Sequence, residues 1–268
     1  MKQHSIIAKL QLILPLLIIF ICAFGFLFAP NDPDLVDMTI KFLPPCAEYP
    51  LGTDNLGRCV LSRLLYGGQT TLGIVLVGSV TVSGLGTLAG LLMGGGKHGK
   101  NVVLEGVLNA VTAIPPIAYL IIFIAAWGNS VFTMLVAVGA SLILKMIKLV
   151  QTRTEIEQSK AYVMCAVASG AKQSRILFAH ILPNLIWDVL HFIFLSCADM
   201  VLSIVSFSFI GLGMGDNVID WGGMVSETHH YLLSHPGLTL YPVAMIVLCT
   251  MAFHLLGRWI ERRVSINA

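Results

Sequence analysis

Long apolar stretches separated by short polar segments dominate the pattern of residues along this chain. A hydrocarbon core about 30 Å thick is crossed by roughly 20 apolar residues in a helix that rises about 1.5 Å per residue, and runs of about this length recur. The pattern therefore predicts an all-α integral membrane protein with six transmembrane helices. The six predicted spans cover residues 10–29, 70–95, 107–127, 130–144, 185–209 and 240–256.

The composition excludes a soluble globular domain. Hydrophobic residues make up 56% of the 268 positions and charged residues only 11%, and the mean hydropathy is +0.85. A soluble chain of this length cannot bury so much apolar surface. The first apolar run ends at Ala29-Pro30 without a signal-peptidase cleavage pattern, so we expect it to remain as a span.

The positions of lysine and arginine predict the orientation, because positively charged loops stay in the cytoplasm. If both termini are cytoplasmic, all of the 16 lysines and arginines lie inside except Lys41, Arg58 and Arg63. We therefore expect both termini in the cytoplasm. The largest external segment is then 30–68, and the largest cytoplasmic segment is 145–184.

Two smaller patterns concern packing. Gly86, Gly90 and Gly94 recur every four residues in the second predicted span, which places them on one helical face and favours close packing within one subunit. Cys46 and Cys59 share the external segment, and a disulfide between them is left open.

The stretch AYVMCAVASGAKQSRILFAHILPN, residues 161–184, has three basic residues and no acidic residue. It predicts a short helix over 161–169 that ends at Gly170, since glycine suits the left-handed conformation at a helix end. A second helix over 172–182 follows at an angle and is ended by Pro183.

Two interpretations of this stretch follow from its residues. The first helix is rich in small side chains, so it fits into the groove of a partner protein. Alternatively, both helices lie on the membrane surface with Lys172 and Arg175 on anionic headgroups.

The spacing favours the partner, because the stretch resembles the cytoplasmic loop of bacterial ABC importer permeases. That loop has the signature Glu-Ala-Ala, three residues, Gly and, further along, an ending similar to Ile-Leu-Pro. The matching residues are Met164-Cys165-Ala166, Gly170 and His180-Ile181-Leu182-Pro183-Asn184. LGTDNLGRCVLSRLLYGGQTTL (51–72) and SFSFIGLGMG (206–215) are similar to blocks of the dipeptide, oligopeptide and nickel permease family.

The resemblance implies a type I importer permease in a bacterial inner membrane, with a cytoplasmic coupling helix between spans four and five. Residues 1–68 would form an N-terminal span and external loop, and 69–268 the permease domain. Its implied partners are a second homologous permease, two cytoplasmic ATPase subunits, an external solute-binding protein and the lipid bilayer; no nucleic acid is expected. The residues implied to couple to the ATPase are Tyr162, Met164, Cys165, Ala166, Gly170 and Pro183.

The chain is predicted to be a transport subunit without enzymatic activity or a cofactor of its own. It contains no Gly-x4-Gly-Lys-Ser/Thr motif, so ATP and magnesium would bind to the partner subunits. The motif glutamate is Met164 here, as in some nickel and metal-chelate permeases. This departure favours nickel or another transition metal as substrate, with di- or oligopeptides as the alternative.

Ionisable residues interrupt the fifth span. Asp188, His191 and Asp199 share a broad helical face. Such groups are costly in lipid, so they predict lining of the translocation pathway, and Asp199 is the strongest candidate. The alternative is that Asp188 is solvated at the cytoplasmic interface and that His191 is hydrogen-bonded to another helix. Glu227, with His229, His230 and His235, lies in the next external loop, where contact with a binding protein is favoured over metal capture.

Two other classes of protein are less consistent with the chain. A secondary transporter usually shows ionisable residues on several spans and an inverted repeat, and neither is apparent. An intramembrane enzyme would need paired catalytic residues within the spans, and none is found.

Overall fold

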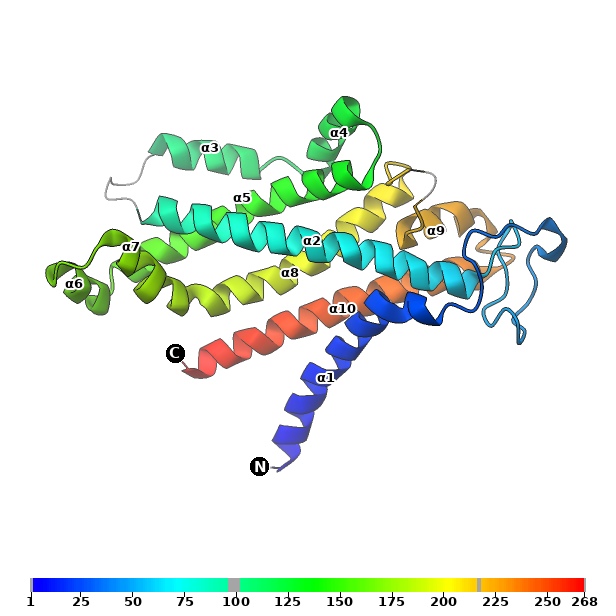
Figure 1. Cartoon of the computed structure of the whole chain (residues 1–268), viewed down its shortest axis with the longest axis horizontal. Helices are drawn as coiled ribbons and strands as arrows, with labels where there is room; N and C mark the ends of the chain where they lie inside the picture. Colours follow the sequence, from blue (N-terminus) through cyan, green and yellow to red (C-terminus); the bar gives the residue numbers. More distant parts are fainter. Residues whose placement is uncertain (1, 96–101, 216–217, 268) are drawn as a thin grey trace.

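The computed structural model describes residues 2–95, 102–215 and 218–267 as a bundle of helices (Figure 1). In these ranges no strand forms, and the only bridge joins Thr53 to Cys59. The helices are α1 (Lys2–Phe24), α2 (Val60–Gly94), α3 (Val102–Thr112), α4 (Pro116–Trp127), α5 (Val131–Gln158), α6 (Ala161–Ala168), α7 (Gln173–Arg175), α8 (Leu182–Phe209), α9 (Trp221–Thr228) and α10 (Pro236–Asn267). Short 3₁₀ turns η1 (Gly25–Phe28), η2 (Met38–Ile40) and η4 (His229–Tyr231) and the π-helical segment η3 (Ile176–Ile181) complete it.

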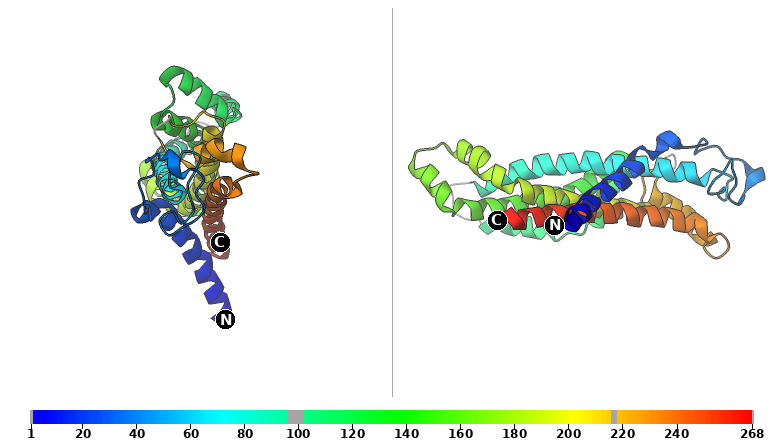
Figure 2. Two further views of the ribbon diagram at one scale, coloured as in Figure 1. Left: turned by 90° about the vertical axis from the view of Figure 1, so that its right-hand side faces the viewer. Right: turned by 90° about the horizontal axis from the view of Figure 1, so that it is seen from below.

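The long helices run side by side, with α6 and α7 at one end and α9 at the other (Figure 1 and Figure 2). We refer to these as the α6 end and the α9 end. Five helical stretches of the described chain are long and apolar enough to cross a membrane, and α3 and α4 together make a sixth only if a bent pair counts as one span. The all-α class is therefore confirmed.

Three predicted spans need correction. The third is broken: the axes of α3 and α4 differ by 82°, because the prolines at 115 and 116 cannot donate the hydrogen bonds of a continuous helix. The second span begins ten residues earlier, at Val60, and the fourth continues beyond residue 144 to Gln158. The predicted bounds covered only the apolar part of each helix. Both helices continue into polar residues beyond that part.

The second helix packs on α5 through its glycines. A Cβ atom on Gly86 would lie 2.6 Å from Met146 Cγ, and one on Gly90 would lie 2.6 Å from the Ile147 carbonyl oxygen. Gly94 meets the Gln151 carbonyl in the same way, at 2.7 Å. The prediction of close packing inside one subunit is confirmed.

A valine at position 90 is expected to lower the stability of the α2–α5 pair by about 1–3 kcal/mol, because its Cβ would collide with the α5 backbone. Gly84 provides the control: it lies on the same helix, and a Cβ atom added there would have no neighbouring atom within 4 Å. Thermal unfolding of the purified chain in detergent should show an early transition for Gly90→Val and none for Gly84→Val. Equal transitions would contradict the packing described here.

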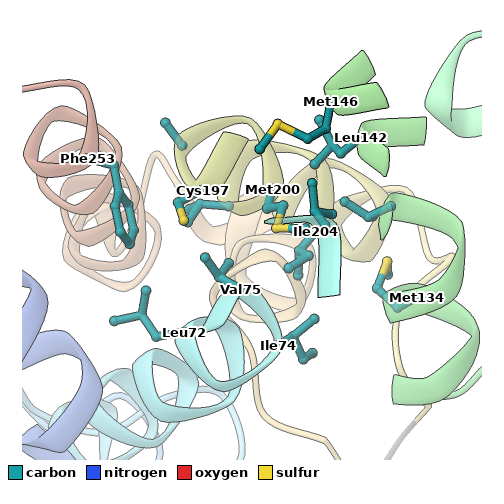
Figure 3. Packing of buried hydrophobic residues seen from close by; sticks show 14 of the residues in the cluster. Leu72, Ile74, Val75, Met134, Leu142, Met146, Cys197, Met200, Ile204 and Phe253 are labelled. Atoms are coloured by element: carbon teal, nitrogen blue, oxygen red, sulfur yellow. The ribbon is translucent and has the colours of Figure 1, made fainter. Parts of the chain in front are cut away.

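The core lies between α2, α5, α8 and α10. Figure 3 shows Leu72 and Val75 of α2, Met146 of α5, Met200 of α8 and Phe253 of α10 facing one another. Outside this core many large apolar side chains are exposed, among them Phe20 at 58% and Val80 at 72%. Such a surface suits lipid or a partner protein in the membrane.

Candidate functional site

The helix α6 projects from the α6 end as a short finger between α5 and α7 (Figure 1). The helix ends as predicted, since Gly170 is left-handed with a φ of 75°. The Gly170 N–H donates to the Val167 carbonyl, and the Ala171 N–H donates to the Ala166 carbonyl. This pair of bonds satisfies the last carbonyls of the helix. Residues of the sequence-predicted motif therefore lie on one compact turn of chain.

The finger has an apolar outer surface. Met164 is 56% exposed and Val167 58%, and Cys165 is also exposed, whereas Val163 is buried at 2%. Val163 and the half-buried Ala166 therefore seat α6 on the bundle. The exposed side chains form a small, uncharged surface that projects beyond the long helices.

Three polar side chains fix α6 to both neighbouring spans, a group that we name the finger clamp (Glu157, Tyr162 and Asn184). The Tyr162 hydroxyl donates to Glu157 Oε2 of α5 at 2.6 Å and accepts from Asn184 Nδ2 of α8 at 2.9 Å. Glu157 is buried at 8% and also pairs with Lys160. Burial raises the pKa of Tyr162, and its hydrogen bond to the Glu157 carboxylate raises it further.

The clamp depends on an unbroken helix through Pro183, which corrects the prediction that this proline separates two helices. The run from Gln173 to Phe209 forms one stretch that is long and apolar enough to cross a membrane. Immediately before Pro183, the chain forms the π-helical turn η3 (Ile176–Ile181). Such a wider turn accommodates the missing N–H of a proline in the first turn of α8, and Pro183 itself is exposed.

Two glutamines complete the contacts at the α6 end. Gln158 Nε2 donates to the Gly94 carbonyl at 3.0 Å, and Gln173 Nε2 donates to the Gly95 carbonyl at 2.7 Å. Both bonds satisfy carbonyls at the end of α2, where a helix has no partners of its own. The ends of α2, α5, α6 and α8 are thus held together by side chains.

The ionisable residues of α8 have different surroundings. Asp188 pairs with Arg153 of α5, with 3.5 Å between Nε and Oδ2. His191 Nδ1 lies 2.9 Å from the Gly257 carbonyl oxygen of α10. Asp199 is exposed and forms no hydrogen bond or ion pair with the residues that the structure describes. The structure does not bring the three together into one site.

An ion-pair network at the α9 end was missed by the sequence analysis. Arg58 Nε lies 2.7 Å from Asp54 Oδ2, and both Arg58 and Arg63 contact the Glu227 carboxylate of α9. Asp54 and Arg63 are buried, at 3% and 5%. The available signal was the presence of two arginines in a segment that the sequence places on the side predicted to be poor in positive charge.

The described histidines at the α9 end are not arranged as metal ligands. His235 stacks on Phe42 with 4.3 Å between ring centroids, and His229 Nδ1 lies 2.7 Å from the Ser226 carbonyl oxygen. Within the described ranges no three His, Cys, Asp or Glu side chains are grouped so as to hold a metal ion. Cys46 and Cys59 are both free thiols, the first exposed and the second buried, so the disulfide left open above does not form.

A helical bundle with helices long and apolar enough to cross a membrane, an apolar finger at one end and a bonded loop at the other is the architecture of an integral membrane protein. A sequence model of the family described as "Binding-protein-dependent transport system inner membrane component" matches residues 84–266. The chain belongs to this family. It is therefore a permease subunit of an ABC importer, not an enzyme, and it works with ATPase and binding-protein partners.

Relatives extend the similarity to almost the whole chain. The peptide transport system permease protein SapC of Escherichia coli O6:H1 is 31% identical over 254 residues, which cover 91% of this chain and 84% of the relative. The probable D,D-dipeptide transport system permease protein DdpC of Escherichia coli K12 is 28% identical, with 96% and 86% covered. The dipeptide transport system permease protein DppC of Alkalihalophilus pseudofirmus is 29% identical, with 80% and 70% covered.

Proposed function

We propose that this permease takes part in the import of di- or oligopeptides. The observation that carries the proposal is the description of its relatives, three of which are peptide or dipeptide permeases. The sequence analysis favoured nickel on the strength of Met164 alone. That residue lies on the exposed surface of the finger, which is proposed below to contact the ATPase.

We further propose that the α6 end faces the cytoplasm and that both termini are cytoplasmic, in a bacterial inner membrane. The distribution of lysine and arginine supports this orientation. Residues 1–68 then supply the first span and the external loop, and 69–268 the permease domain; the boundary falls within α2 (Val60–Gly94), so the two parts share that helix.

In this orientation α6 is the element that enters a cleft of the ATPase. Its surface consists of Met164, Cys165 and Val167, and Gly170 ends it sharply. Tyr162 and Ala166 attach it to the bundle, and the helix that passes through Pro183 continues as α8. We propose a complex of this chain with a second homologous permease, two ATPase subunits that bind ATP and magnesium, and an external solute-binding protein.

Asp199 is the residue of α8 that we retain for the translocation pathway. It is exposed and has no ion-pair partner among the described residues, whereas Asp188 and His191 are engaged by Arg153 and by Gly257. A carboxylate in a span is costly unless it faces water or a partner.

Uptake by cells that lack the gene tests the substrate class. Cells complemented with the gene are expected to accumulate a radiolabelled dipeptide at least about tenfold above uncomplemented cells, and an excess of unlabelled tripeptide should reduce the signal. Radioactive nickel, given separately, should enter both strains equally. Accumulation of nickel without dipeptide would overturn the peptide proposal and restore the metal alternative.

A further inference from the structure

The break between α3 and α4 leaves backbone acceptors without partners. We call residues 112–115 the elbow. In a continuous helix, the N–H groups of residues 115 and 116 would donate to the carbonyls of Val111 and Thr112, but both residues are prolines. The chain therefore bends by 82° at this point.

Two of the carbonyls at the bend find donors, and that of Pro115 accepts from the Ala118 N–H at 3.0 Å. The Val111 carbonyl accepts from the Ile114 N–H at 3.1 Å and from the Tyr119 hydroxyl at 2.7 Å. The carbonyls of Thr112, Ala113 and Ile114 accept no hydrogen bond from the residues that the structure describes. Ala113 and Ile114 are also exposed, Ile114 at 40%. The elbow thus has three successive carbonyls without a donor among the described residues.

The elbow joins two helices that together are long and apolar enough to cross a membrane. Asn109 of α3 accepts a hydrogen bond from Lys148 of α5. The elbow lies three to six residues further along, within roughly 9 Å at the rise of a helix. On α5, Ile143 and Met146 precede Lys148 by five and two residues. These two residues pack against Gly86 of α2, inside its long apolar run. Figure 1 shows α3 and α4 as an outer layer beside α5.

Lipid cannot cover the elbow. Acyl chains offer no donors, and each backbone carbonyl left unpaired in hydrocarbon costs several kcal/mol. Non-helical backbone occurs at this depth only where it is buried in protein or lines a water-filled cavity. The three carbonyls need donors, which water supplies and which another apolar helix does not.

We propose that the elbow lines the aqueous translocation path between this chain and a second permease, and that its carbonyls accept hydrogen bonds from the cargo. This inference rests on the proposed import of peptides. A peptide carries amide N–H groups and an N-terminal ammonium, and these donors are the same whatever its side chains are. A row of main-chain acceptors therefore contacts peptides of many sequences without selecting among them.

Accessibility to a charged thiol reagent tests the proposal in the assembled importer, reconstituted in nanodiscs. The exposed native thiols Cys46 and Cys165 are first replaced by serine. A cysteine in place of Ile114 is expected to react with a charged methanethiosulfonate at least about 50-fold faster than one in place of Leu85. Leu85 is the matched control, since it is 56% exposed and lies within the long apolar run of α2, next to Gly86.

A photoreactive benzoylphenylalanine in place of Ile114 gives the second readout, and it should form adducts with the second permease. An unreactive cysteine together with lipid adducts would overturn the proposal, because the elbow would face lipid. An unreactive cysteine together with permease adducts would also overturn it, because the contact would be dry. Neither readout depends on transport, so failure of dipeptide uptake would count against the proposed cargo and leave the position of the elbow to be judged separately.

Discussion

Replacement of Arg63 by methionine is expected to lower the free energy of unfolding by about 3 kcal/mol. The side chain is 6% exposed and contacts Glu227 at 3.1 Å and, more distantly, Asp54 at 3.8 Å. Removal of one partner of a buried ion pair costs about 3–5 kcal/mol, because the remaining charge stays buried without compensation. The lower end applies here, since the Glu227 side chain is 43% exposed and Arg58 still contacts both carboxylates.

The measurement is thermal unfolding of the purified chain in detergent, where a loss of this size corresponds to a shift of roughly 6–12 °C. Lys41→Met is the matched control, because Lys41 is an exposed cation of the same external segment with no ion pair among the described residues. Glu227→Gln should cost less than Arg63→Met, since the amide oxygen still accepts from both guanidinium groups. If Arg63→Met and Lys41→Met unfold alike, the network does not hold α9 to the external loop.

Removal of the Tyr162 hydroxyl is expected to uncouple the ATPase from the spans. In the Tyr162→Phe variant, α6 keeps its seat through Val163 but loses its hydrogen bonds to Glu157 of α5 and Asn184 of α8. A hydrogen bond to a charged group contributes about 1.5–3 kcal/mol and a neutral one about 1 kcal/mol. Since about 1.4 kcal/mol is a factor of ten, stimulation of ATP hydrolysis by the binding protein should fall at least about tenfold.

The readout compares basal and stimulated hydrolysis in the reconstituted complex, using the binding protein with the solute it carries on purification. Basal hydrolysis and ATPase retention should not change in Tyr162→Phe. Glu157→Ala should behave in the same way, whereas Glu157→Gln, which keeps an acceptor oxygen, should recover part of the stimulation. Tyr66→Phe is the control, since no hydrogen bond of the Tyr66 hydroxyl is found within the described ranges. Unchanged stimulation in both Tyr162→Phe and Glu157→Ala would show that the clamp does not transmit movement.

The ion-pair network and the finger clamp lie at opposite ends of the bundle, and each contains a glutamate that joins separate segments of the chain. At the α9 end, Glu227 joins the external loop to α9, and at the α6 end, Glu157 joins the finger to α5. Both carboxylates contact donors from other segments of the chain. Each carboxylate thereby ties neighbouring segments of the chain together at its end of the bundle.

The class of protein and most of its spans could be predicted from the sequence, because a bilayer imposes the length and apolarity of a helix directly on the order of residues. The left-handed end at Gly170 and the glycine face of α2 were predictable for a similar reason. Each depends on backbone geometry within a few residues, and glycine is the residue that permits it.

Helix continuity was predicted less well. The sequence predicted one continuous span through the two prolines after Ile114, but the helix breaks there. It predicted a helix end at Pro183, but the helix continues through that residue. The sequence alone does not settle the outcome at a proline, which depends on what satisfies the freed carbonyls. A π-helical turn precedes Pro183, whereas the elbow leaves three carbonyls open.

The sequence by itself determined that this chain is a polytopic membrane protein with a protruding finger, since both properties depend on neighbouring residues. Only the tertiary structure decided which polar residues pair, because Arg63 and Glu227, or Tyr162 and Asn184, approach one another through helix packing and not through spacing along the chain. It likewise decided that Asp188 and His191 have partners while Asp199 and the elbow carbonyls remain open. The physical reason is that burial and pairing set the cost of a polar group in a membrane, and both are properties of the folded neighbourhood.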